Sequence, residues 1–138
     1  MKLSEFASTR QKEIRLKTDV ISLLLDELGN PQLSNKYIHI TGTNGKGSVS
    51  AFTDAILRSS GLSVCRFNSP HLITPSDSLL YNGKQISKEE LSGLFKEIEP
   101  AAKRVEKICG RHPSQFEILA SAAFLYFKKK KLFPSTFL

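Results

Sequence analysis

The spacing of apolar residues in the first half of the chain predicts two helices and two strands. After Thr18, a suitable N-cap, apolar residues recur at helical spacing, and Gly29 with Pro31 ends this predicted helix. The short run "KYIHIT" is rich in β-forming residues and predicts a buried strand, and "LSVCRF" predicts a second strand. Between them, "SVSAFTDAILRSS" has helical spacing up to Gly61, and one face of that helix carries Val49, Phe52, Ile56 and Leu57.

The second half predicts a hairpin and two more helices. Asn82-Gly83 in "LLYNGKQI" is a hairpin-turn signal between short strands. Two capping boxes follow, Ser87 with Glu90 and Ser114 with Glu117. They predict one helix that runs to about residue 108 and another through "QFEILASAAFLYFKKKK".

These elements predict an α/β domain with a small sheet. A strand, a helix and a second strand imply parallel pairing with a right-handed crossover, and the helices would flank the sheet. A further strand should follow the last helix in such a domain, but "LFPSTFL" contains a proline and stops at Leu138. We therefore expect only two parallel strands and the hairpin.

A glycine-rich loop joins the first strand to its helix and predicts phosphate binding. Backbone amides at a helix start can converge on an anion, and the helix dipole adds partial positive charge. Glycine permits the backbone conformations and the close approach that this needs, and Lys46 would supply a charge for the β- and γ-phosphates. The alternative is a glycine-rich turn with a solvated lysine. The loop residues are Gly42, Thr43, Asn44, Gly45, Lys46, Gly47 and Ser48.

This loop departs from the generic P-loop pattern. Two residues, Thr43 and Asn44, replace the usual four before Gly-Lys, and Gly47 separates Lys46 from Ser48. Ser48 could either cap the helix or touch a phosphate.

The composition fits a single globular domain with an anionic partner. The 138 residues include 40% hydrophobic and 24% charged residues, and the net charge is +7. Cys65 and Cys109 lack metal-ligand spacing, so we interpret both as reduced, buried thiols of an intracellular protein. There is no secretory signal and no window of ~20 apolar residues for a membrane helix. We expect a soluble cytoplasmic protein and leave a mitochondrial location open.

The loop and several later segments resemble one enzyme family. "HITGTNGKGSVSAF" is similar to the P-loop of the folylpolyglutamate synthase and dihydrofolate synthase family, within the Mur ligase superfamily. "LLLDELGNPQ", "FNSPHLI", "NGKQIS" and "SQFEILASAAFLYF" resemble further family segments, in the same order. The resemblance covers about residues 20 to 130. It implies a P-loop-containing, Mur-ligase-like ATP-binding domain with a parallel sheet and flanking helices.

The resemblance implies an ATP-dependent ligase that joins L-glutamate to a pteroate or folate carboxylate through an acyl phosphate. The loop residues would bind ATP, with Lys46 as the catalytic cation, and Ser69 would bind Mg²⁺. His71 would contact substrate or close its loop. We interpret His39 as structural and Glu117 as a capping residue. The expected partners are dihydropteroate or folate, L-glutamate and ATP, with no nucleic acid or membrane, and we expect a monomer.

The sequence also departs from this family. The segment "TPSDSLLYNG" lacks the Arg-Glu-Arg-Ile run of many folylpolyglutamate synthases and looks more like the dihydrofolate synthase type. The family's later metal ligands and C-terminal domain are absent, so residues 1–138 resemble the N-terminal portion of the ATP-binding domain. A truncated enzyme without turnover and a non-catalytic nucleotide-binding remnant are both compatible with this sequence.

Two rival classes have weaker support. A P-loop kinase or ATPase would need an acidic metal ligand at a strand end, and Asp54 and Asp77 are not so placed. A nucleic-acid module would depend on the net charge and on the lysine run 128–131, with no recognised binding motif. We interpret that run as a solvated helix end.

Overall fold

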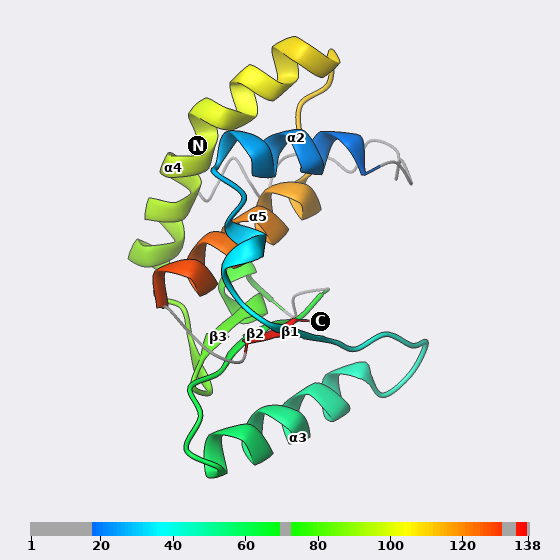
Figure 1. Ribbon diagram of the computed structural model, residues 1–138, viewed down its shortest axis with the longest axis vertical. Coiled ribbons are helices and arrows are strands. Elements are labelled where there is room, and N and C mark those ends of the chain that lie inside the picture. The colour runs from blue at the N-terminus through cyan, green and yellow to red at the C-terminus, as the bar shows by residue number, and fades with distance from the viewer. Residues whose placement is uncertain (1–17, 70–72, 131–134, 138) are drawn as a thin grey trace. The chain divides into compact units, whose positions relative to one another are not determined.

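The computed structural model describes residues 18–69, 73–130 and 135–137, which form two compact units (Figure 1). One unit is helical and contains α2 with most of α4 and α5. The other contains the sheet and α3. No helix among the described residues is long and apolar enough to cross a bilayer.

The helical unit is built on α2 (Asp19–Glu27), α4 (Lys88–Cys109) and α5 (Gln115–Lys130). Thr18 is the N-cap residue of α2 as predicted, although its side chain makes no capping hydrogen bond. The predicted capping box of α5 is confirmed, because the Glu117 amide donates to Ser114 Oγ and the Ser114 amide donates to the Glu117 carboxylate. Helix α4 buries one side at helical spacing, through Leu91, Leu94, Phe95, Ile98, Ala101, Ala102 and Val105.

The sheet has five strands in the order β1-β5-β2-β3-β4. Their bounds are β1 Tyr37–His39, β2 Cys65–Phe67, β3 Leu79–Tyr81, β4 Lys84–Gln85 and β5 Ser135–Phe137. Strand β5 is parallel to β1 and β2, whereas β3 is antiparallel to β2 and to β4. Two 3₁₀ turns, η1 (Pro31–Ser34) and η2 (Pro75–Ser78), complete the described elements. The predicted α/β class is confirmed, with a sheet that is mixed rather than wholly parallel.

The expectation that the C-terminal segment adds no strand is wrong. Ser135–Phe137 forms β5, which lies between β1 and β2 and pairs with both. The two strands of the predicted strand–helix–strand unit are therefore parallel to one another but not adjacent. Three residues after a proline can form a strand because neighbours on both sides supply its hydrogen bonds, which the local sequence does not reveal.

The predicted hairpin is confirmed, and it is anchored to β2. Asn82 and Gly83 have φ values of 48° and 80°, as a two-residue hairpin turn of type I′ requires. The Asn82 amide donates to the Val64 carbonyl, and its side-chain Oδ1 accepts from the Val64 amide, both at 2.8 Å. Of the two cysteines, both free, Cys65 is buried as expected, whereas Cys109 is partly exposed.

Helix α3 (Lys46–Ser59) runs beside the sheet from the end of β2 to the hairpin. Ser50, one turn into α3, contacts Asn68 just after β2. At the other end, the guanidinium of Arg58 lies so close to Gly83 that a Cβ there would be 3.2 Å away. The first contact places the beginning of α3 near the loop that follows β2, and the second places its end near the hairpin turn.

Candidate functional site

The glycine-rich loop connects β1 directly to the start of α3. The chain turns through Thr43, Asn44 and Gly45, and α3 begins at Lys46. The segment is therefore a compact loop and not an extended strand. All of its residues except Lys46 are exposed, and Lys46 is partly exposed.

Three backbone amides at the start of α3 are available to a ligand. The first hydrogen bond of the helix joins the Val49 amide to the Gly45 carbonyl at 3.0 Å. The amides of Lys46, Gly47 and Ser48 therefore have no acceptor within the helix. The first turn of α3 contains no acidic residue. These amides and the positive end of the helix dipole together favour an anion at this position.

The ammonium group of Lys46 is held at the same place. Its Nζ donates a hydrogen bond of 2.7 Å to the carbonyl oxygen of Gly42, on the opposite side of the loop. An ammonium has three donors, so two remain for a ligand. The loop thus presents a fixed positive charge beside the exposed amides.

Glycine at position 45 and glycine at position 47 have different backbone conformations and different surroundings. Gly45 has a φ of 76°, in the left-handed region, and is the N-cap of α3. A side chain there would be strained. Gly47 lies inside the helix without positive φ, and no atom lies within 4 Å of the position that a Cβ would take. Glycine lowers helix stability by ~1 kcal/mol relative to alanine, and the open space at Gly47 leaves room for another group to approach the backbone.

The two interpretations of Ser48 can now be separated. The N-cap position belongs to Gly45, so Ser48 does not cap α3. Ser48 lies in the first turn with its side chain exposed. The interpretation that its hydroxyl or amide touches a phosphate stays a prediction.

Ser69 follows β2 in a loop that is tied to α3. The Asn68 amide donates to the Ser78 carbonyl at 2.8 Å, and Ser50 Oγ lies 3.5 Å from Asn68 Oδ1. The residue before Ser69 is thereby held one turn from Lys46 along α3, and Ser69 itself is exposed. Ser50 and Asn68 are 18 residues apart, and no sequence pattern predicts their contact. His71 lies outside the described residues, so its predicted contact with substrate is untested.

The residues around the loop fit a magnesium ion that is bound mainly through phosphates. Within residues 18–69, 73–130 and 135–137, no group of three His, Cys, Asp or Glu side chains could hold a metal. Mg²⁺ commonly uses one or two protein ligands and completes its shell with water and phosphate oxygens. The exposed hydroxyl of Ser69 is a hard donor of this kind.

Two acidic residues that could have served a metal have other partners. Asp54 is buried and forms an ion pair with Arg58 at 3.0 Å. Asp77 accepts hydrogen bonds from the amides of Ile73 and Thr74 at 2.8 Å and from Gln85 Nε2 at 2.9 Å. These bonds hold the pKa of Asp77 below its ordinary value, with the Thr74 amide as the main cause. The sequence signal for this role was Thr74 three residues before Asp77, at capping-box spacing.

Glu117 has the structural role that its capping position predicted. Its two carboxylate oxygens accept hydrogen bonds of 3.0 Å from both terminal nitrogens of Arg111. Burial raises the pKa of Glu117, but Arg111 and Ser114 outweigh it and hold the pKa below its usual value. The carboxylate therefore stays ionised at neutral pH and stabilises the start of α5. His39 and Ile38 are both exposed on β1, so the expectation that this strand is buried is wrong, because β1 lies at the edge of the described sheet.

Comparisons with known proteins identify one group of enzymes. No known family model matches the sequence. The chain is 38% identical over 104 residues to the dihydrofolate synthase/folylpolyglutamate synthase of Bacillus subtilis, covering 75% of this chain and 24% of that protein. It is 37% identical over 114 residues to the dihydrofolate synthetase of Saccharomyces cerevisiae, covering 83% of this chain and 26% of that protein.

The solved structures agree with these relatives. The Mycobacterium tuberculosis folylpolyglutamate synthase complexed with ADP matches with a TM-score of 0.87 at 32% identity, over 98% of this chain and 31% of that one. The chain spans about a quarter of the length of the relatives it matches.

Proposed function

Because the chain belongs to the dihydrofolate synthase/folylpolyglutamate synthase family and spans about a quarter of the length of the relatives it matches, we propose that it is the ATP-binding part of an amide ligase. The ligase joins L-glutamate to a pteroate or folate carboxylate. The observation that carries this proposal is the loop of residues 42–48, where exposed helix-start amides lie beside the ammonium of Lys46. The ADP in the mycobacterial relative supports a nucleotide as its ligand.

The proposed reaction has two steps. A carboxylate oxygen attacks the γ-phosphorus of ATP and ADP leaves, and the amine of glutamate then displaces phosphate from the acyl phosphate to form the amide. Negative charge builds on the transferring group, and preorganised amides with a lysine stabilise it. Gly42–Ser48 would bind the phosphates in this scheme, with the Lys46 ammonium at the β- and γ-phosphates. When bound, Mg²⁺ would supply further positive charge for the phosphates, and Ser69 would hold it.

We favour the dihydrofolate synthase type over the folylpolyglutamate synthase type, on the sequence of the segment "TPSDS". Asp77 in that segment accepts hydrogen bonds from two backbone amides, so its carboxylate already has a structural role. The preference therefore does not depend on a contact between Asp77 and a substrate. Glutamate incorporation with dihydropteroate or with a reduced folate as acceptor, measured on a longer protein that contains this stretch, distinguishes the two.

Nucleotide binding is the direct test of the proposal. Titration of the chain with ADP and Mg²⁺ by calorimetry should show one site, and Lys46→Ala should weaken it by ~10–100-fold, because a hydrogen bond to a charged group contributes ~1.5–3 kcal/mol. Lys96→Ala, which removes an exposed lysine from α4, is the matched control and should leave affinity unchanged. Equal affinity in the two variants would contradict the proposal.

Turnover is a separate matter from binding. We propose ligase activity for a protein that contains this stretch and the rest of the family's fold. For these 138 residues alone we expect nucleotide binding without glutamate-dependent phosphate release. Phosphate release that needs both dihydropteroate and glutamate would overturn this expectation.

A further inference from the structure

The tripeptide Asn-Gly-Lys occurs twice in the chain, and the two copies lie in different surroundings. Residues 44–46 belong to the phosphate loop, and residues 82–84 include the hairpin turn between β3 and β4. An asparagine before a glycine is especially prone to spontaneous deamidation, because glycine has no side chain to hinder attack by its backbone nitrogen on the asparagine side chain. The local structure of each copy then determines how fast it reacts.

In the phosphate loop, Asn44 is exposed and unrestrained. Neither its side chain nor the Gly45 amide has a hydrogen-bond partner among residues 18–69, 73–130 and 135–137. No atom lies within 4 Å of the position that a Cβ at Gly45 would take. The side-chain carbonyl carbon of Asn44 and the nitrogen that would attack it are therefore both accessible.

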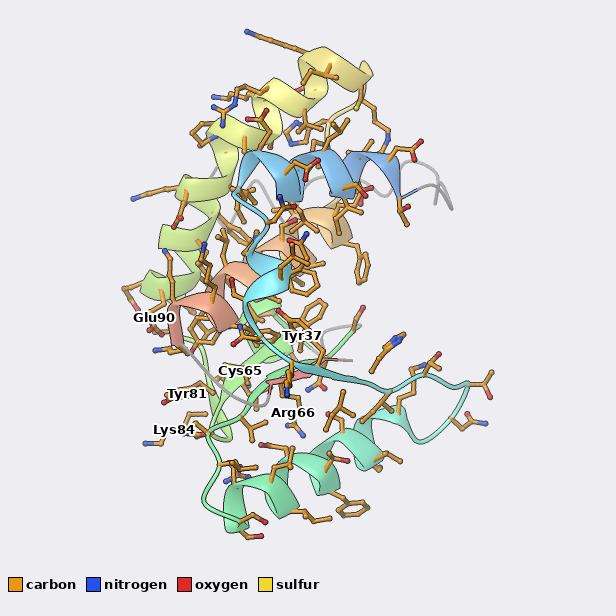
Figure 2. All side chains as sticks on the ribbon, in the orientation of Figure 1. Tyr37, Cys65, Arg66, Tyr81, Lys84 and Glu90 are labelled. Atoms are coloured by element: carbon orange, nitrogen blue, oxygen red, sulfur yellow. The ribbon has the colours of Figure 1, made fainter. Side chains whose placement is uncertain are left out.

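In the hairpin turn, Asn82 is held by the segment that leads into β2. Its Oδ1 accepts a hydrogen bond from the Val64 amide and its own amide donates to the Val64 carbonyl, both at 2.8 Å. Tyr81 and Lys84, which flank the turn, pair across the hairpin and lie close together in Figure 2. The side chain of Asn82 must lose its bond to Val64 before it can cyclise, so this copy should react more slowly.

The positive charge of the phosphate loop also favours reaction at Asn44. Attack by the Gly45 nitrogen places negative charge on Asn44 Oδ1 in the tetrahedral intermediate. The helix-start amides and the Lys46 ammonium favour negative charge in the same loop. At the hairpin turn no helix begins, because β4 follows directly.

We propose that Asn44 is a site of spontaneous deamidation, and that the reaction changes the phosphate loop from one that attracts anions to one that repels them. The Gly45 nitrogen forms a bond to Asn44 Cγ, the bond between Cγ and the side-chain nitrogen breaks, and ammonia leaves. Water then opens the resulting succinimide at either carbonyl, which gives aspartate or isoaspartate. Water is the only co-reactant, and no electron is transferred.

The product would alter the loop in two ways. It places a carboxylate two residues before Lys46, at a helix whose first turn contains no acidic residue. The isoaspartate form also adds one carbon to the backbone just before Gly45, which would displace the helix-start amides. The loss of nucleotide binding that we expect rests on the proposed function, whereas the modification site itself does not.

Peptide mass spectrometry tests the modification site on the chain without nucleotide. The folded chain would be incubated at mildly alkaline pH, and the conversion of each asparagine to its acid would be followed over time. We expect Asn44 to react at least ~5-fold faster than Asn82, because only Asn82 must first lose a hydrogen bond. In urea that unfolds the chain, the two rates should become nearly equal, since both asparagines precede the same Gly-Lys pair.

The matched control is Asn44→Gln, whose longer side chain would have to form a less favourable six-membered ring. It should show no conversion at position 44 and an unchanged rate at Asn82. Equal rates for Asn44 and Asn82 in the folded parent chain would overturn the proposal. So would an unreacted Asn44 in the folded chain after a time in which the unfolded chain is fully converted.

The effect on the loop is measured with Asn44→Asp, and Asn82→Asp is its matched control, because each variant replaces one amide by a carboxylate. Titration with ADP and Mg²⁺ should show affinity weakened by ~10-fold in Asn44→Asp, as repulsion between nearby charges at a protein surface can produce. Asn82→Asp should bind as the parent chain does. Equal urea midpoints for the parent chain and Asn44→Asp would confirm that the variant is folded.

The outcomes separate the two proposals. Unchanged affinity in Asn44→Asp, with a parent chain that binds ADP, would refute the change in the loop and leave the proposed function standing. A parent chain that does not bind ADP would refute the proposed function and the loss of binding together. The modification site is decided by the deamidation rates alone.

Discussion

Gly45 and Gly47 allow a test of the loop conformation, because the two residues differ mainly in the backbone angle φ. Both are exposed, and no atom lies within 4 Å of the position of a Cβ at either residue. Gly45 has a φ of 76°, whereas Gly47 has no positive φ. Alanine at either position therefore meets no clash, and the main difference between Gly45→Ala and Gly47→Ala is the strain of a left-handed backbone at position 45.

The expected magnitudes follow from this difference. Replacing glycine lowers the entropy of the unfolded chain and stabilises by ~0.4–1 kcal/mol where the native backbone is compatible. Gly47→Ala should gain this amount. Gly45→Ala gains it too but loses ~1–2 kcal/mol to the left-handed conformation. The free energies of unfolding of the two variants should thus differ by ~1–2 kcal/mol, with Gly45→Ala the less stable.

Urea unfolding followed by circular dichroism measures this difference, provided that the denaturant slopes agree. Equal midpoints for Gly45→Ala and Gly47→Ala would refute the loop conformation described above. ADP titration of the same proteins adds a second result. Gly47→Ala should weaken binding although it stabilises the fold, because its methyl group occupies the space into which a phosphate would come. Unchanged affinity would remove the close-approach argument for Gly47.

Three further predictions concern other parts of the chain. Burial raises the pKa of Cys65 to about 12, so iodoacetamide should modify Cys109 in the native protein and leave Cys65 unmodified until unfolding. Glu117→Gln should cost about 1–3 kcal/mol at pH 7, because it weakens the bidentate pair with Arg111. The pKa of Glu117 is depressed below its ordinary value of 4.5, so this loss should be full above that pH and should shrink as the pH falls through the depressed pKa. Gly83→Ala should cost about 1–2 kcal/mol in urea unfolding, since Gly83 has a φ of 80°.

A specific result would contradict each of these predictions. Equal alkylation rates for the two native thiols would mean that Cys65 is not buried. A stability difference between Glu117→Gln and the parent chain that persists at about pH 2 would exclude the carboxylate charge as its cause. Gly61 has a φ of 83° and open space around it, so Gly61→Ala is the control for Gly83→Ala. A milder effect at Gly83 than at Gly61 would contradict the contact with Arg58.

The sequence predicted the elements next to the loop well, because their signals are local. The β-rich run before Gly42, the glycines and the helical spacing after Lys46 each appear in the structure where they were expected. The hairpin turn at Asn82 and the capping box at Ser114 are likewise predicted by residues that are close together in the sequence.

The remaining features depend on long-range contacts. Strand β5 forms where a proline-containing segment gave no strand signal, because β1 and β2 pair with it from both sides. Apolar spacing identified α3 as a helix but did not reveal that Ser50 and Asp54 would be its buried residues. Ser50 contacts Asn68, which is 18 residues away, and Asp54 pairs with Arg58 on the same helix. The spacing of apolar residues predicts neither of these polar contacts.

The place of β5 between β1 and β2 has a consequence for how the phosphate loop acquires its shape. Of the described strands, Ser135–Phe137 is the last to leave the ribosome, and β1 has no other neighbour among them. Among the described residues, the strand that leads into the loop therefore gains its hydrogen-bonded neighbour only after residues 135–137 have been synthesised, later than the helices and the hairpin. Amide protons of β1 and β5 should consequently gain protection together.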